Sequence, residues 1–306
     1  MEESVVPDKI KRIMLLNDIP ACQEYLKVLT DYLFDLILKL HGKKYSSVRM
    51  NESGIWVQMM FTNTLAFSKL LEGMSYVRDD IRMNPIIDHR MIYSLGRTMY
   101  ENLITFELLY ILPADDDKKT LIYDLYEAAG YKEQLEVLSN EEKQKHPDRV
   151  KEIEDSLNGV MSEAQSTLFY TSSTEQVKQI VDNAIHNGKF RYRFNPDGTM
   201  KKVEYDEGME LIDVNSEIFT GMYKYFSNLS HPSHWGQLQF EQSFDAIKPE
   251  YISLACTATK YVVTFICLFI NDFKNISDEA KQVLAEQSPD NQQLIMLYNH
   301  MFRGDN

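Results

Sequence analysis

Cysteine is scarce in this sequence, and its placement excludes two common uses of the residue. The chain has 306 residues and only three cysteines. An odd number rules out a fully paired disulfide framework, and the sequence contains neither a CxxC pair nor a Cys/His spacing typical of zinc ligands. The cysteines lie in apolar segments, at Cys22, Cys256 and Cys267. We interpret them as reduced core residues of a cytosolic protein.

Several short motifs that identify enzymes are also missing. The sequence has no Gly-x-Ser-x-Gly segment, no HExxH pair, no Walker loop and no dinucleotide glycine fingerprint. Each motif supplies groups that its chemistry requires: a displayed nucleophile, two zinc ligands on one helix face, or backbone amides that hold phosphates. Their absence argues against serine hydrolases of that type, zinc proteases and the enzymes built on these two phosphate-binding loops. We therefore expect no metal site and no bound cofactor.

Positive charge is outweighed by negative charge. The chain carries 46 Asp and Glu residues against 32 Lys and Arg residues, which gives a formal net charge of −14. A surface of this sign repels phosphate backbones, so nucleic-acid binding is expected at most locally. One cationic spot lies on a predicted β-hairpin, and we interpret it as a solvated face of that hairpin. Its residues are Arg191, Arg193, Lys201 and Lys202.

Neither a secretory signal nor a membrane span is expected. The first twelve residues carry acidic groups where a signal peptide would carry basic ones, so the predicted location is the cytoplasm. The stretch 252–270 approaches the length of about 20 residues that spans a bilayer. Lys260 lies near its centre, however, where insertion scales give a cost of about 2.5–3.5 kcal/mol for a charge. We interpret the stretch as a buried core helix.

Apolar residues at helical spacing predict an all-α fold, a multi-helix bundle in one domain of residues 1–306. Its core helices come from 1–113 and 206–306, and we expect the chain to pack around the helix from Pro85 to Pro113. Asp18 and Pro20 begin one helix, which Gly42 ends, and Ser53 caps another. The other predicted core helices are 8–17, 207–231, 250–273, 278–287 and 290–302, and Trp235 is placed in a loop.

The segment 114–205 is more polar and is predicted to form a peripheral helical insertion. Helices are expected at 115–138 and 146–169, and at 172–188, where Ser172 and Glu175 have the form of a capping box. A small β-hairpin is predicted near 189–205, because Asp197-Gly198 supplies a tight turn between short aromatic strands. We expect this hairpin to be the only sheet.

The predicted helix 85–113 carries charges on a face that is otherwise apolar. Arg90, Arg97 and Glu101 share this face with Ile104 and Leu108. Arg97 and Glu101 are one turn apart, and on an exposed helix such a pair contributes only about 0.2–0.5 kcal/mol. On an inner face the guanidinium would be held in place to bind a carboxylate or phosphate with two donors. The alternative is a structural ion pair that holds two helices in register.

A second polar strip lies on the predicted helix 207–231. Tyr223, Ser227 and His231 are each four residues apart, and Pro232 ends the helix after His231. The helix dipole favours a protonated ring at this end, and histidine can change its charge near neutral pH. His231 therefore suits proton transfer or anion binding. It equally suits a histidine that caps the last carbonyl groups of its helix.

Together these two strips resemble a family of all-helical bacterial proteins known only as a domain of unknown function. Its members combine an apolar helix bearing Arg-x3-Glu with a distant Tyr-x3-Ser-x3-His strip followed by Pro-Ser. The resemblance implies an α-helical fold in which the two helices face each other across one pocket, and it implies no particular activity. The matching residues are Arg97, Glu101, Tyr223, Ser227, His231, Pro232 and Ser233.

The chain is more distantly similar to the HEPN helical superfamily, whose RNase members use Arg-x4–6-His near the active site. The sequence departs from this pattern in two ways. Arg97 and His231 lie on different predicted helices, and the segment Arg82-x6-His89 contains Asn84-Pro85. A proline at that place is unfavourable inside a helix.

The two strips support three hypotheses about function. The first is a cytosolic binding or regulatory module with a buried polar pocket for a small anionic ligand or a partner's carboxylate. The second is a phosphodiester-cleaving RNase of a defence or toxin system, with catalytic candidates His231, Arg97 and Glu101. The third is a structural ion-pair network in an interaction protein, with a protein partner or a second copy of the chain. The predicted ligand-binding residues are Arg90, Arg97, Glu101, Tyr223, Ser227, His231 and Ser233.

Overall fold

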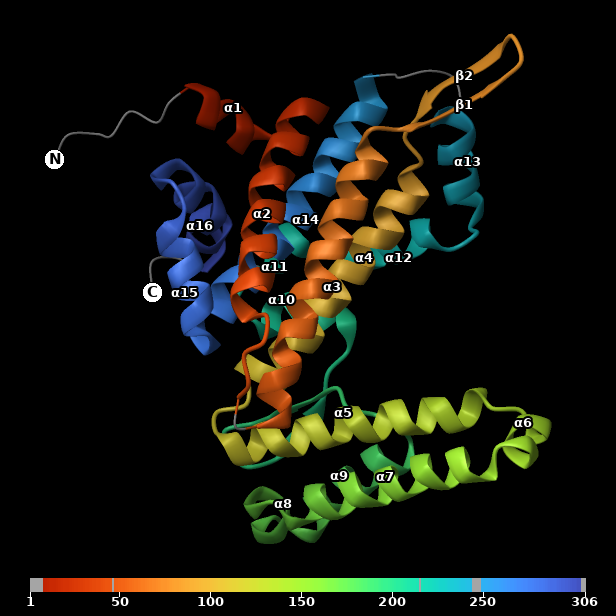
Figure 1. Cartoon of the computed structure of the whole chain (residues 1–306), viewed down its shortest axis with the longest axis vertical. Helices are drawn as coiled ribbons and strands as arrows, with labels where there is room; N and C mark the ends of the chain where they lie inside the picture. Colours follow the sequence, from red (N-terminus) through yellow and green to blue (C-terminus); the bar gives the residue numbers. More distant parts are fainter. Residues whose placement is uncertain (1–7, 46, 215, 244–248, 304–306) are drawn as a thin grey trace, which may run out of the picture. The chain divides into compact units, whose positions relative to one another are not determined.

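The computed structural model describes residues 8–45, 47–214, 216–243 and 249–303. Residues 1–7, on which the expectation about export partly rests, lie outside this range. The described residues form helices and two small antiparallel sheets (Figure 1), so the predicted all-α class is confirmed. The chain divides into two compact units. Unit 1 comprises Met1–Ile104 and Met209–Asn306, and unit 2 comprises Thr105–Gly208.

Most elements of the chain belong to unit 1. Asp18 begins α2 by accepting a hydrogen bond from the backbone of Ala21, and Pro20 lies in the first turn, as predicted. The elements, in chain order, are α1 (Asp8–Leu15), α2 (Ile19–Leu40), α3 (Val48–Leu71), β1 (Met74–Arg78), β2 (Ile81–Ile86), α4 (His89–Phe106), α10 (Gly208–Leu211), α11 (Ser216–Phe219), α12 (Met222–Ser230), α13 (His234–Ser243), α14 (Pro249–Ile276), α15 (Asp278–Glu286) and α16 (Pro289–Arg303).

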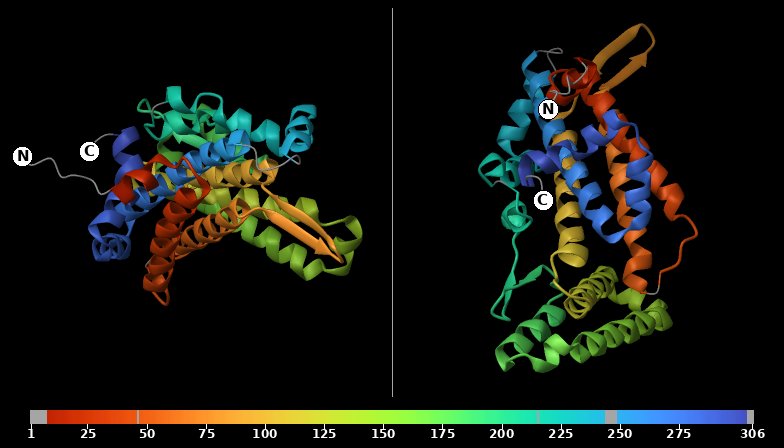
Figure 2. Two further views of the ribbon diagram at one scale, coloured as in Figure 1. Left: turned by 90° about the horizontal axis from the view of Figure 1, so that it is seen from above. Right: turned by 90° about the vertical axis from the view of Figure 1, so that its left-hand side faces the viewer.

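The core of unit 1 is organised around α14 rather than around the predicted helix 85–113. α14 contacts α2, α3, α15 and α16, and the views of Figure 2 place it alongside α2 and α4. Its residues from Val262 to Phe273 are buried without interruption. Of the described helices, α14 alone has the length and composition to cross a membrane, and 67% of its most apolar window is buried in the protein. This burial confirms the predicted core helix at 252–270.

A hairpin occupies the segment where we expected one helix to end and the next to begin. β1 pairs antiparallel with β2, with Tyr76 opposite Met83, and Asp79 in the turn has a φ of 53°. The described residues therefore contain two hairpins, and the expectation of a single sheet was wrong. Pro85 is part of β2, so α4 begins later than predicted, at His89. Both strands are mostly exposed and only five and six residues long, so the sequence shows no clear period that would have separated them from a helix.

The single helix predicted from Glu207 to His231 is broken in the structure. α10, α11 and α12 are separate, and the breaks include Asp213 and Gly221, whose φ angles are 58° and 75°. A residue with positive φ cannot continue a right-handed helix, so each position interrupts the pattern of helical backbone hydrogen bonds. α12 nevertheless keeps Tyr223 and Ser227 on one helix, and it ends just before Pro232, as predicted.

Two helix starts lie elsewhere than predicted, and one predicted loop is a helix. Ser47, not Ser53, caps α3, because its side chain accepts a hydrogen bond from the backbone of Met50. Thr174, not Ser172, caps α9. The segment around Trp235 is helical rather than a loop and forms α13. Several Ser and Thr residues precede each of these helices, and all of them are suitable caps by residue type.

Unit 2 contains the whole of the predicted insertion 114–205. Asp115 caps α5, Gly188 with a φ of 58° follows α9, and the second hairpin forms as predicted. Lys201 and Lys202 on that hairpin are exposed and paired with acidic neighbours, in agreement with a solvated face. The elements are the π-helix η1 (Glu107–Ile111), α5 (Asp116–Val137), α6 (Asn140–Lys145), α7 (Pro147–Ser166), α8 (Leu168–Ser172), α9 (Glu175–His186), β3 (Tyr192–Phe194), β4 (Met200–Lys202) and the 3-10 helix η2 (Tyr205–Glu207).

Candidate functional site

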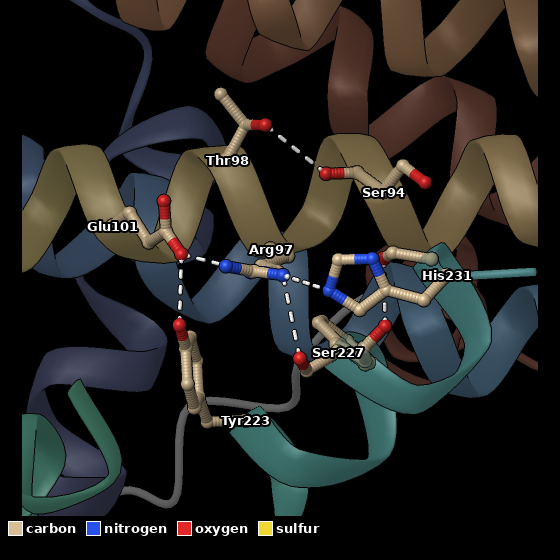
Figure 3. Close-up of polar contacts among 9 residues, drawn as sticks. Ser94, Arg97, Thr98, Glu101, Tyr223, Ser227 and His231 are labelled. Atoms are coloured by element: carbon tan, nitrogen blue, oxygen red, sulfur yellow. Dashed lines mark hydrogen bonds and ion pairs between the residues drawn. The ribbon is translucent and has the colours of Figure 1, made fainter.

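The candidate site lies in unit 1, where α12 runs beside α4. α12 starts after Gly221, whose positive φ interrupts the preceding backbone, and it stops at Ser230 because Pro232 does not allow the helix to continue. Phe226 and Leu229 on α12 are buried in the core. The polar strip of α12 lies beside these apolar residues and faces α4 (Figure 3).

Gly96 allows α12 to approach α4 closely. A Cβ atom at Gly96 would lie 3.0 Å from Cε2 of Phe226 on α12 and 3.4 Å from Cγ2 of Val262 on α14. The first distance is shorter than the optimal carbon–carbon separation of about 3.5–4.0 Å. Only glycine therefore fits here without movement of the Phe226 ring. Because Ser227 follows Phe226 directly, Gly96 also helps to set the spacing between Ser227 and the polar residues of α4.

Gly96→Ala is expected to lower the free energy of unfolding of unit 1 by about 1–3 kcal/mol, because the added methyl group overpacks the contact with Phe226. Urea unfolding followed by tryptophan fluorescence measures the effect, since both Trp56 and Trp235 belong to unit 1. Gly54→Ala on α3 is the matched control, because its new Cβ would meet nothing closer than 3.9 Å. Alanine favours a helix over glycine, so the control should be neutral or stabilising. Equal losses in the two variants would argue against a special role for Gly96.

Arg97 on α4 lies at the centre of a polar group of five residues, which we name the Arg97 cluster: Arg97, Glu101, Tyr223, Ser227 and His231. Its Nε donates to Oε1 of Glu101 at 2.8 Å, and the Tyr223 hydroxyl donates to the same oxygen at 2.9 Å. Nη1 of Arg97 lies 3.3 Å from Oγ of Ser227 and 3.2 Å from Nε2 of His231. Figure 3 shows the guanidinium between the two helices, with Glu101 and Tyr223 on one side and Ser227 and His231 on the other. The structure thus brings together five of the seven predicted residues.

The Arg97 cluster is partly exposed, whereas we expected a buried pocket. The side chain of Arg97 is 25% exposed and that of Glu101 is 27% exposed. His231 is more exposed still, because it follows the last residue of α12 and is not covered by the core. A ligand can therefore reach the cluster from solvent. The partial exposure also means that the Arg97–Glu101 pair is not a fully desolvated ion pair.

Glu101 and Arg97 shift the titration of the groups around them. Burial acts to lower the pKa of Arg97, but the hydrogen bond and charge of Glu101 outweigh it and raise the pKa above its ordinary value. Burial, followed by the hydrogen bond to Glu101, raises the pKa of Tyr223 to about 12. At neutral pH the guanidinium is therefore charged and the phenol keeps its proton, as the observed donor roles require.

The contact with Arg97 decides which nitrogen of His231 carries a proton. A guanidinium has only donors, so Nε2 of His231 must accept the hydrogen bond from Nη1. The ring proton then lies on Nδ1. Ser227 likewise offers its oxygen to Nη1 as an acceptor. One nitrogen of the guanidinium therefore meets two neutral acceptors at distances of more than 3 Å, near the long end of the usual range.

Two of the predicted residues lie outside the Arg97 cluster. Arg90 binds Asp88 through two nitrogens, and its guanidinium lies 4.1 Å from the ring centre of Phe240. The Ser233 hydroxyl accepts a hydrogen bond from the backbone of Gly236 and donates to a carbonyl of α12, so it caps the first turn of α13. Each side chain is occupied in holding local structure.

The Arg-x6-His spacing of the distant RNase resemblance does not lie on one helix. Arg82 is in β2 and His89 is the first residue of α4. His89 is buried, and its Nε2 lies 2.9 Å from the backbone oxygen of Tyr251 on α14. Burial lowers the pKa of His89, which keeps the ring neutral. His89 therefore acts as a packed core residue.

Sequence reasoning missed an aromatic group formed by Trp235, Tyr225 and Tyr93. The Trp235 ring packs edge-on against Tyr225, with 5.4 Å between ring centres, and Tyr225 packs in the same way against Tyr93 at 5.2 Å. Trp235 is 45% exposed. The sequence places Trp235 only four residues after His231, which could have indicated that it belongs near α12. Because we predicted a loop at this position, we did not expect it to pack against Tyr225.

Unit 2 has a separate cavity of about 570 Å³. It is lined by Phe169, Phe194 and the hairpin turn, and its charged lining residues are Lys118 and Asp197. Lys118 is already bound to Asp115, and Asp197 accepts two hydrogen bonds from Thr199. None of the predicted site residues lines this cavity.

Comparison of the sequence with protein families, with curated proteins and with solved structures found no match.

Proposed function

We propose that the protein is a cytosolic binding or regulatory module that holds a small oxyanion, a phosphate or a carboxylate, at the Arg97 cluster. The observation that carries this proposal is the position of Nη1 of Arg97, which belongs to a partly exposed side chain and makes two long hydrogen bonds to neutral acceptors. An anionic oxygen is a stronger partner for a guanidinium than either a hydroxyl or an imidazole. The cysteines, which are all free and buried, suit a reducing compartment.

The other members of the Arg97 cluster prepare the guanidinium for this role. Glu101 holds Nε and thereby fixes the orientation of the planar group, and Tyr223 in turn holds Glu101. A guanidinium that is already oriented loses less side-chain freedom when a ligand binds. The hydroxyl of Ser227 and the ring of His231 lie on the open side, where each can turn a donor toward an oxyanion.

The proposal predicts that phosphate and sulfate stabilise the wild-type protein beyond chloride at the same ionic strength. Arg97→Gln is expected to weaken the affinity for phosphate by roughly 10- to 100-fold, because a hydrogen bond to a charged group contributes about 1.5–3 kcal/mol. The midpoint of thermal unfolding, measured against phosphate concentration, gives the affinity through the mass-action relation.

Arg90→Gln is the matched control for this experiment. Arg90 lies on the same helix and is also partly exposed, but it is bound to Asp88 and stacked on Phe240. The control should therefore bind phosphate as the wild type does. Equal stabilisation of wild type and Arg97→Gln by phosphate would show that the anion binds elsewhere. Failure of phosphate, sulfate and carboxylates to stabilise the wild type would leave a structural network as the better account of the Arg97 cluster.

The contact between His231 and Arg97 favours a second candidate function, the cleavage of a phosphodiester. An imidazole whose Nε2 accepts a hydrogen bond has the form of a general base, and a guanidinium beside it can stabilise charge that develops on a phosphate. When Arg97 turns to the phosphate oxygens, Nε2 of His231 would be free to take the proton of the attacking 2′-hydroxyl, and the bond from phosphorus to the 5′-oxygen would break as that oxygen leaves with a proton from water. Incubation with end-labelled RNA tests this candidate. RNA left intact by the wild type, or cleaved equally by His231→Ala, would remove it.

A further inference from the structure

Trp235 presents an anchored aromatic surface to solvent on the first turn of α13. Its ring is 45% exposed, although one side is held edge-on against Tyr225. Tyr225 is itself held by Tyr93, both through ring packing at 5.2 Å and through hydroxyl oxygens that lie 3.4 Å apart. The indole is therefore supported by Tyr225, which Tyr93 holds in turn, and a large part of Trp235 is open to solvent.

This aromatic surface is linked to the Arg97 cluster through α4 and through the connection from α12 to α13. On α4, Tyr93 precedes Arg97 by one helical turn, a rise of about 6 Å. On α12, Tyr225 lies two residues before Ser227, and Trp235 follows His231 by four residues across the short connection to α13. The chain between His231 and Trp235 is held tightly, because Ser233 bonds to both α12 and α13. The indole is thus linked, through Tyr225 and Tyr93, to the face of α4 that carries Arg97 one turn further on.

We infer that the oxyanion held by the Arg97 cluster is the phosphate of a nucleotide whose base stacks on Trp235. This inference rests on the proposed function and adds the class of ligand to it. Every nucleobase has an aromatic face that stacks on an indole without the need for specific hydrogen bonds. A mononucleotide fits the electrostatics better than a long nucleic acid, since the chain carries a net charge of −14 and offers one fixed cation in this cluster.

The inference predicts that AMP binds the full-length protein more tightly than inorganic phosphate or glycerol phosphate, by roughly 5- to 100-fold, the range expected for one base stacked on an aromatic ring. AMP should also quench tryptophan fluorescence. The chain has only two tryptophans, and Trp56 is 7% exposed, so quenching by a bound base reports on Trp235. Thermal unfolding against ligand concentration gives all three affinities on one scale.

Trp235→Ala distinguishes the contribution of the base to the affinity from that of the phosphate. This variant should bind AMP only as tightly as it binds inorganic phosphate, and its affinity for phosphate should equal that of the wild type. Trp235→Phe, which keeps an aromatic face, should recover part of the preference for AMP. Arg97→Gln should weaken the binding of both ligands. Circular dichroism of each variant confirms that the helices remain folded.

The failures of the two proposals are distinguishable. If phosphate binds in an Arg97-dependent way but AMP binds no more tightly, or if Trp235→Ala keeps the full preference for AMP, the nucleotide inference is overturned and the anion site stands. If neither phosphate nor AMP stabilises the wild type, the anion site itself is refuted, and the inference fails with it.

Discussion

Replacing Arg303 with alanine is expected to lower the free energy of unfolding of unit 1 by about 3–5 kcal/mol, because the change strands a buried carboxylate. Nη1 of Arg303 contacts both carboxylate oxygens of Asp272, at 2.6 and 2.7 Å, and Nε donates to the backbone oxygen of Ile212 at 3.0 Å. The side chains are only 15% and 4% exposed for Arg303 and Asp272. One guanidinium therefore joins α16 to α14 and to the turn after α10.

Urea unfolding followed by tryptophan fluorescence measures this loss in unit 1. The double variant Asp272→Asn with Arg303→Ala removes the stranded charge, so it should be more stable than Arg303→Ala alone. Lys27→Ala is the control, because Lys27 and Asp31 form an exposed ion pair on α2, with side chains 73% and 55% exposed. An Arg303→Ala protein as stable as the Lys27→Ala protein would contradict the importance of the buried pair.

Asp124→Asn is expected to stabilise unit 2 at neutral pH by about 2–4 kcal/mol. Asp124 on α5 is only 4% exposed, and its Oδ2 has no hydrogen-bond partner among the described residues. Burial, together with the charges of Glu163 and Glu127, raises the pKa of Asp124 to about 8. Asparagine cannot ionise, so it removes the penalty of keeping this carboxyl group protonated and buried.

Because the pKa of Asp124 is raised in the folded protein, the stability gained by Asp124→Asn depends on pH. In the unfolded chain the carboxyl group of Asp124 releases its proton near the ordinary aspartate pKa of 3.8, whereas in the folded protein it keeps the proton until pH is about 8. Between these values the unfolded state binds fewer protons, so the stability of the wild type falls as pH rises, by about 1.4 kcal/mol per pH unit from this group. The advantage of Asp124→Asn should be absent below about pH 4, grow across this window and then level off.

Hydrogen exchange of peptides from α5 and α7, corrected for the intrinsic exchange rate, measures this effect in unit 2 alone. Asp155→Asn is the control, since Asp155 is an exposed carboxylate on α7. The control should not change the protection of either helix. A gain from Asp124→Asn that is the same at pH 5 and pH 8 would show that it arises from packing and not from ionisation.

The helical class and many helix ends could be predicted because they depend on neighbouring residues. Asp18 and Asp115 begin helices by accepting hydrogen bonds from backbone N–H groups three residues ahead. Gly188 follows a helix end because glycine readily adopts a positive φ, and Pro232 follows one because proline disfavours a helical conformation in the residue before it. The turn at Asp197-Gly198 also follows from local conformation. Such signals act over a few residues, so they can be recognised in the sequence without knowledge of the fold.

The errors concern features that local signals leave ambiguous. Ser47 and Ser53 are both suitable caps, and only the packing of α3 decides between them. The hairpin at 74–86 has too few residues for a clear period, and the breaks at Asp213 and Gly221 depend on backbone angles that the residue types permit but do not require. The exposure of Trp235 also follows from tertiary packing, because its ring packs against Tyr225, ten residues earlier in the chain.

For the candidate site, the sequence alone determined the content of each strip. The spacing of Arg97 and Glu101, and of Tyr223, Ser227 and His231, places each set on one side of the chain, because helical geometry repeats every 3.6 residues. Only the tertiary structure decided that the two sets meet, that they remain partly open to solvent and that Trp235 packs against Tyr225. The reason is that the distance between the two polar strips depends on how closely α12 can approach α4. That approach is set by contacts between residues far apart in the chain, such as Gly96 and Phe226.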